Sequence, residues 1–316
     1  MSKWRSMKRW KRNLIRTVCI IAILYAGLAA FYYITLHTTY TRRIEQLNNF
    51  PNFADDGAQI TFTFDLNRRD LYMDLIEEFG LDEITAGYED VALMRVLLNW
   101  VSSNFPHHGN SGMPVNLDAM SIVEYVRENP RGINCRGLAI LLAEVLRLYG
   151  IEAKHITVMA PEDAHPVHVV THAFSRELQQ WVFLDPTFGV YITDEYGNFM
   201  NLYTLRRAFA EGAVLFVNGD ASRGHFNRGF NMREFRQFTA DYLFRFVSGT
   251  HFGFGSERGD ADNLCIMLVP YGFSAPYDFR AFNLVMIFIR LLGGQGSAAE
   301  MDVVTTSADA FFAIPE

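Results

Sequence analysis

The chain has 316 residues, of which 50% are hydrophobic, and its formal net charge is −7. It is long enough to bury a sizeable core as one large domain or two small ones. Residues 1–16 carry seven basic and no acidic side chains, whereas the rest carries 21 basic and 35 acidic ones, a net charge of −14. A body this acidic has no electrostatic reason to bind nucleic acid, so that class of function is excluded.

An uncharged stretch follows the basic segment. Residues 17–36 form a run of 20 uncharged residues, close to the length that crosses a bilayer core of ~30 Å. Because the basic segment precedes it, residues 1–16 are expected in the cytoplasm and the C-terminal domain outside. The alternative is a cleaved signal peptide with its cleavage region at residues 26–30. The aromatic residues that follow suit a membrane interface better, so we expect an uncleaved, single-pass anchor in the lipid bilayer.

Beyond the anchor, residues 37–58 are polar and predict a juxtamembrane connector. We expect residues 59–215 to form the core of an extracytoplasmic domain and residues 216–316 to complete the same domain. Hydrophobic periodicity in the first part of this core predicts one strand at 60–64 and helices at 70–79, 90–105 and 118–128. A loop with two histidines and two glycines is expected at 106–112.

The next segment, residues 132–150, predicts a helix with a cysteine in its first turn. Asn134 is a suitable N-cap, leucine and valine recur behind it at helical spacing, and Gly150 supplies a stop. Cys135 therefore lies among unpaired backbone N–H groups at the positive end of the helix dipole. This position favours the thiolate and is typical of a nucleophile.

After this helix the sequence period changes. Runs of β-branched and aromatic residues predict antiparallel strands at 152–159, 167–174 and 180–184. Residues 201–247 are predicted to return to helix, because aromatic residues at 235, 238, 242 and 246 follow helical spacing and form a core stripe.

Three histidines around the second strand are candidate bases for Cys135: His165, His168 and His172. On a strand, His168 and His172 share a face but stand ~13 Å apart, so they cannot both contact one sulfur or one metal ion. A zinc site formed by the three is disfavoured for the same reason. Asp185 ends the following strand, where a hairpin would bring it beside one end of the His168 strand. A disulfide between Cys135 and Cys265 is the structural alternative to a reactive thiol.

These segments together resemble the transglutaminase-like, papain-related cysteine superfamily. The resemblance covers roughly residues 90–215, and its pieces are Trp100-Val, Asn134-Cys135-Arg-Gly-Leu-Ala, Tyr149-Gly-Ile-Glu-Ala, His168-Val-Val-Thr and Trp181-Val-Phe-Leu-Asp185-Pro-Thr. It implies an α+β fold in which a cysteine-bearing helix packs on an antiparallel β-sheet. It also implies that Cys135 is the nucleophile, His168 the general base and acid, and Asp185 the residue that orients the imidazole.

The same resemblance suggests roles for three neighbours. Trp100 is a candidate for lining the substrate tunnel or for the oxyanion site, and Asn134 and His172 are expected to support the triad from behind. His172 departs from the family pattern, because bacterial members often carry Glu at that place. No metal and no cofactor are expected.

The implied chemistry is acyl transfer through a thioester on Cys135. Water as the acceptor gives a peptidase or amidase, whereas an amine gives a cross-linking enzyme, and the triad is compatible with both. The expected partner is a peptide or protein substrate of the cell envelope. The alternative is a catalytically silent binding or assembly module that keeps the fold.

Overall fold

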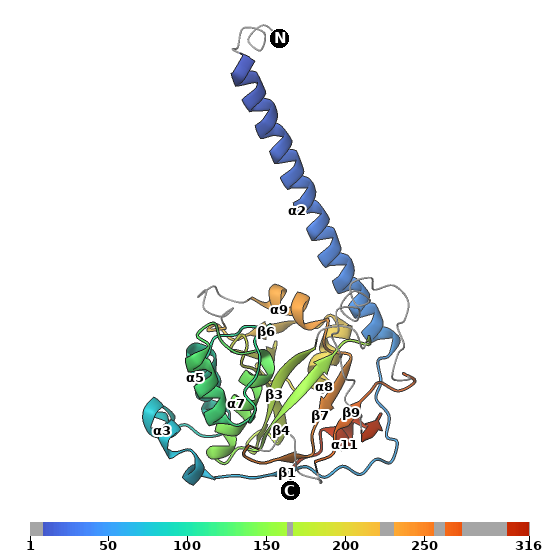
Figure 1. The fold of residues 1–316 in the computed structure, drawn as a ribbon. Helices are drawn as coiled ribbons and strands as arrows, with labels where there is room; N and C mark the ends of the chain where they lie inside the picture. The colour runs from blue at the N-terminus through green and yellow to red at the C-terminus, as the bar shows by residue number, and fades with distance from the viewer. Residues whose placement is uncertain (1–8, 163–166, 222–230, 256–262, 274–301, 316) are drawn as a thin grey trace.

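The computed structural model describes residues 9–162, 167–221, 231–255, 263–273 and 302–315 (Figure 1). Its helices are α2 (Arg9–Asn49), α3 (Met73–Phe79), α4 (Leu81–Thr85), α5 (Asp90–Asn104), α6 (Ala119–Glu128), α7 (Cys135–Leu148), α8 (Leu202–Glu211), α9 (Met232–Thr239) and α11 (Ala308–Phe311), with a 3-10 turn at Arg69–Leu71. Its strands are β1 (Thr63–Phe64), β2 (Ala153–Met159), β3 (His168–Ser175), β4 (Gln180–Asp185), β5 (Val190–Asp194), β6 (Leu215–Val217), β7 (Arg245–Ser248), β8 (His251–Phe252), β9 (Ile266–Leu268) and β10 (Val303–Thr305).

The described strands form one large sheet in the order β10-β9-β7-β2-β3-β4-β5-β6, and β1 pairs with β8 in a separate two-stranded sheet. The α+β class is as predicted, and the strands that carry His168 and Asp185 pair antiparallel as expected, although the sheet as a whole is mixed. Strands β9 and β10 run parallel, as do β1 and β8. The other neighbouring pairs of the large sheet are antiparallel, and in β3-β4 and β4-β5 a short connection favours that direction. The parallel pairs join strands that lie far apart in the sequence, where a long connection permits either direction.

Helix α7 lies against one face of this sheet, with α5 and α6 on its other side (Figure 1). All its residues from Gly137 to Leu148 are buried, including the charged pair Glu144 and Arg147. One hydrophobic core lies between α5, α6, α7 and the sheet. A second core lies on the opposite face of the sheet, beneath α8, α9 and α11. The sheet is therefore covered on both faces, and the strands β7, β9 and β10 from the C-terminal part belong to it.

Helix α2 is longer than the predicted anchor and projects away from the body (Figure 1). Within the part of the chain that the structure describes, no helix meets the length and apolarity needed to cross a membrane. The first part of the expected connector is helical rather than irregular. Here Arg43 is 7% exposed and forms ion pairs with Glu162 at 2.8 Å and Asp241 at 2.9 Å, and Leu47 is 1% exposed. The C-terminal end of α2 is therefore part of the folded body.

The predicted helical return over 201–247 is only partly correct. Helix α8 ends at Gly212, whose φ of +67° suits glycine, and strand β6 follows. Helix α9 contains Phe235 and Phe238, but Phe246 lies in β7, where it pairs with Val158 of β2 and Leu268 of β9. An apolar residue every fourth position fits a strand face as well as a helix face. Residue 246 is in a strand because it pairs with strands on both sides.

Candidate active site

Cys135 is the first residue of α7, as the sequence predicts. The Asn134 side chain caps the helix, because its Oδ1 accepts a hydrogen bond from the Gly137 N–H at 3.2 Å. Its Nδ2 donates to the Ser111 carbonyl at 3.4 Å, which ties the cap to the loop that follows α5. Cys135 is partly exposed. The cap thus places the sulfur at an accessible helix N-terminus, where the backbone N–H groups and the dipole favour negative charge.

Strands β3 and β4 bring His168 and Asp185 together. His168 begins β3 and Asp185 ends β4, and the antiparallel register Thr171 to Leu184 puts these two ends at the same edge of the sheet. His168 Nε2 lies 2.9 Å from Asp185 Oδ2. Asp185 Oδ1 accepts the N–H of Thr187 at 3.0 Å, which fixes the carboxylate. Both side chains are buried, with 5% and 1% exposed.

The same edge meets the N-terminus of α7, so His168 also contacts Cys135. The Cys135 sulfur accepts hydrogen bonds from the His168 ring and from the Val169 backbone N–H. Because Nε2 of His168 is taken by Asp185, its Nδ1 is the nitrogen that faces the sulfur. The predicted proximity of Cys135, His168 and Asp185 is therefore present, and their catalytic roles stay a prediction.

The electrostatics of this group favour an ion pair. Burial alone raises the pKa of the Cys135 thiol, but hydrogen bonds from His107 and His168 and the charge on His168 outweigh it and lower the pKa to about 6. Burial alone lowers the pKa of His168, but the charge of Asp185, its hydrogen bond and the contact with Cys135 raise the pKa to about 10. Between these values the resting pair is thiolate and imidazolium, the form that attacks a carbonyl group.

His107 is a residue of the site that sequence reasoning missed. Its ring donates a second hydrogen bond to the Cys135 sulfur, and its backbone forms a parallel β-bridge with Ile133. Pro106-His107 ends one helix and Gly132 precedes the cysteine, but no local pattern shows that the two segments pair.

His172 is fully buried, and its contacts are with Leu202 and Trp181 rather than with Cys135. Its Nε2 accepts the Leu202 N–H at the start of α8, at 3.1 Å, and its ring stacks on Trp181. Burial, with the charge of Lys154, lowers the pKa of His172 well below its ordinary value, so the ring is neutral. It therefore anchors α8 to the sheet. His165, the third candidate, lies outside the described residues.

Trp100 lies in the core rather than at the sulfur. Its indole packs edge-on against Phe79 and Phe105, with ring centroids 5.2 Å apart in each case, and it is 6% exposed. Within the described residues, its Nε1 has no hydrogen-bond partner. These contacts are those of a core residue, and a role in lining the substrate site stays a prediction.

The alternative to a reactive thiol was a disulfide between Cys135 and Cys265. Among the described residues, which include all three cysteines, no disulfide joins Cys135 to Cys265. Cys135 is a free cysteine in the structure, and its reactivity stays a prediction. Within the same residues, no group of three or more His, Cys, Asp or Glu side chains is arranged to hold a metal ion.

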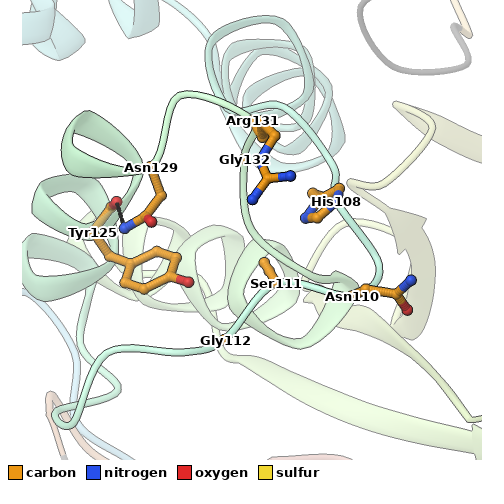
Figure 2. A pocket seen from close by; sticks show the side chains of 8 residues that line it. All are labelled: His108, Asn110, Ser111, Gly112, Tyr125, Asn129, Arg131 and Gly132. Atoms are coloured by element: carbon orange, nitrogen blue, oxygen red, sulfur yellow. Dashed lines mark hydrogen bonds between the residues drawn. The ribbon is translucent and has the colours of Figure 1, made fainter.

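Aromatic side chains surround His168, and a separate polar pocket lies on the loop after α5. The His168 ring is covered by Phe238, Tyr242 and Phe188, at centroid distances of 5.0, 5.7 and 6.1 Å. On the loop that carries His107 there is a small pocket of about 120 Å³, lined by His108, Asn110, Ser111, Gly112, Tyr125, Asn129, Arg131 and Gly132. Figure 2 shows the side chains of Arg131 and His108 next to each other in it, across from Tyr125 and Asn129.

A cysteine at a helix N-terminus thus contacts a strand histidine that pairs with an aspartate, on an α+β fold consistent with a transglutaminase-like or papain-like one. Residues 82–186 match the family model of the transglutaminase-like superfamily, so the chain carries a transglutaminase-like domain over these residues. The match includes Cys135, His168 and Asp185. None of the curated proteins is significantly similar in sequence.

Two solved structures resemble parts of this chain. One is a "putative cysteine protease" from Cytophaga hutchinsonii, with 20% identity, a TM-score of 0.30, and coverage of 51% of this chain and 50% of that chain. The other is the arylamine N-acetyltransferase of Nocardia farcinica, with 15% identity, a TM-score of 0.28, and coverage of 55% of this chain and 74% of that chain. This chain thus matches half the length of the first.

Proposed function

We propose that this protein is a thiol-dependent enzyme that transfers acyl groups from amide bonds of peptides or proteins. In this proposal Cys135 is the nucleophile, His168 the general acid and base, and Asp185 the group that orients His168. The observation that carries it is the continuous contact from Cys135 through His168 to Asp185, with a thiol pKa of about 6 beside an imidazole pKa of about 10. The transglutaminase-like domain at residues 82–186 supports the same reading.

The reaction follows from this geometry. The Cys135 thiolate attacks the amide carbonyl carbon, a C–S bond forms, and the carbonyl electron pair moves onto oxygen. The pair returns as the C–N bond breaks, and the leaving amine takes the proton from His168 Nδ1. An acceptor, either water or a primary amine, then attacks the thioester and gives its proton to His168, which restores the thiolate. Asp185 holds the imidazole so that Nδ1 points at the sulfur throughout.

The location of the substrate belongs to the proposal as well. The uncharged run at 17–36 after a basic segment supports a membrane anchor with the domain outside the cell membrane, where envelope peptides and proteins are the available substrates. Protease added to intact cells should then digest the domain. Full protection of the domain would contradict this topology.

One observation favours a second candidate, a silent binding module. His168 is only 5% exposed and is covered by three aromatic rings, an arrangement that also suits a fold kept for packing. The two candidates are separated by incubating the full-length protein with a library of peptide amides, with and without a labelled primary amine. Free carboxylate products indicate hydrolysis and labelled products indicate cross-linking. The absence of both, together with no acyl adduct on Cys135, would leave the binding module.

A further inference from the structure

A second imidazole contacts the sulfur of Cys135. It belongs to His107, which precedes Cys135 in the sequence, whereas β3 follows it. The His107 ring donates a hydrogen bond to this sulfur independently of His168. The two histidines come from different segments, because His107 lies in the loop after α5 and His168 in β3. Among the described residues, the Asp185 side chain bonds to His168 and to the backbone of Thr187. The acid and base role therefore belongs to His168, and His107 has a different one.

The position of His107 is fixed by backbone pairing. Residues 106–108 run beside Ile133, where the Ile133 N–H donates to the Pro106 carbonyl at 2.9 Å and the His108 N–H donates to the Ile133 carbonyl at 2.8 Å. Ile133 is two residues before Cys135, so the pairing sets the distance between the His107 ring and the sulfur. We call residues 106–108 the strap.

One glycine allows the strap to lie this close, and a second allows Ile133 to pack on the first turn of α7. Gly132 has a φ of +108°, and a Cβ atom there would stand 1.9 Å from the Pro106 carbonyl oxygen. At Gly137, in the first turn of α7, a Cβ would stand 2.4 Å from Ile133 Cδ1. Both are distances that packed atoms do not adopt. Glycine at 132 thus lets the strap pair with the segment before Cys135, and glycine at 137 leaves room for the Ile133 side chain.

The movement of negative charge in the proposed reaction suggests a function for the hydrogen bond from His107 to the Cys135 sulfur. When the thiolate attacks, its negative charge passes to the carbonyl oxygen, which is bonded to the same carbon as the sulfur. A donor that touches the sulfur in the resting state is therefore within reach of the oxyanion. The Cys135 backbone N–H, at the first position of α7, has no acceptor within its own helix and is therefore available as a second donor.

We propose that His107 is the side-chain donor of the oxyanion hole, acting with the backbone N–H of Cys135. This inference rests on the proposed acyl-transfer function. The ring N–H of His107 stabilises the charge that forms on the carbonyl oxygen, and it keeps its proton while His168 transfers one to the leaving group. It takes the place that sequence reasoning considered for Trp100.

The experiment compares two reactions of one thiolate in the full-length protein. Acylation by p-nitrophenyl acetate passes through an oxyanion and releases p-nitrophenolate, which leaves without a proton from His168. Alkylation by iodoacetamide displaces iodide and forms no oxyanion. For His107→Ala we expect acylation to slow about 10²–10³-fold, while alkylation at a pH where the thiol is fully ionised changes far less. His107→Gln, which keeps an N–H donor, should recover much of the lost rate.

His108→Gln is the matched control, since it lies on the same strap but lines the pocket of Figure 2. It should acylate like the wild type. Unchanged acylation in His107→Ala would overturn the proposal, as would an equal loss of acylation and alkylation in both His107 variants. If wild-type Cys135 is alkylated but never acylated, the proposed function itself fails, and the role of His107 fails with it.

Discussion

The Nε2 atom of His168 lies 2.9 Å from Oδ2 of Asp185, at the joined ends of two antiparallel strands, and both side chains are buried. This contact turns the other ring nitrogen of His168 toward Cys135. The contact joins residues drawn from a stretch of about 50 positions, Cys135 to Asp185, and the proposed mechanism depends on it.

Asp185→Asn should weaken the acid and base role of His168. Burial lowers the pKa of His168, and the charge and hydrogen bond of Asp185 are the main effects that raise it to about 10. Without this charge the pKa falls, so the imidazolium is lost at a lower pH and the alkaline limb of the activity profile moves down. We expect turnover at neutral pH to fall about 10²-fold or more. A rate profile over pH measures both effects, and an unmoved alkaline limb would show that Asp185 does not set the charge of His168.

The reactivity of Cys135 toward iodoacetamide should follow a depressed pKa. The thiolate is the reactive form, and its pKa is lowered to about 6 by the hydrogen bonds and charge that outweigh burial. The alkylation rate should therefore be near its maximum at pH 7 to 8 and fall as the pH drops through about 6. Peptide mass spectrometry should find Cys135 labelled well before Cys265. A rate that still rises through pH 8 would contradict the ion pair.

Gly132→Ala should damage both stability and acylation. The new Cβ would clash with the Pro106 carbonyl and the backbone would be strained at its positive φ, which together should cost roughly 2–5 kcal/mol of unfolding free energy. Gly197→Ala is the matched control, because Gly197 also has a positive φ but nothing lies within 4 Å of the added atom. Its cost should be nearer 1 kcal/mol. Urea unfolding compares the two, and equal costs would mean that the strap does not depend on Gly132.

His168→Ala should mainly reduce turnover, whereas His172→Ala should mainly reduce stability. His168→Ala removes the partner of the thiolate and should abolish turnover. His172→Ala leaves the Leu202 N–H without its acceptor in the core and should mainly lower stability, by about 1–3 kcal/mol. Thermal unfolding and turnover of the same samples separate the two effects. A folded but inactive His172→Ala variant would mean that the wrong histidine has been assigned as the base.

Much of the site could be predicted from local patterns. The Asn134 cap, the leucine periodicity and Gly150 identify the Cys135 helix, and the β-branched runs identify the strands that carry His168 and Asp185. His107 could not be found in this way, since its contact depends on the bridge between its own loop and Ile133, a long-range pairing that leaves no periodic trace. The predicted helix at Phe246 was wrong for the same reason, because the residue pairs with β2 and β9, which are distant in sequence.

The end of α2 shows another limit of sequence reasoning. Arg43 looks like an exposed charge in a polar connector, but two acidic partners distant in sequence, Glu162 and Asp241, bury it. Asp241 is next to Tyr242, whose ring covers His168. The connector and the triad are thus close in space. Shortened chains made for assay should therefore keep residues 40–49.

The most direct test of the central claim is intact-protein mass spectrometry after incubation with p-nitrophenyl acetate at pH 7.5. The account predicts one acetyl group on wild-type protein, located on Cys135 by peptide mapping and released by water or by an added primary amine. Cys135→Ala should remain folded and gain no acetyl group, and His168→Ala should react only slowly. A wild-type protein that stays unmodified, or an equal adduct on Cys135→Ala, would contradict a catalytic Cys135.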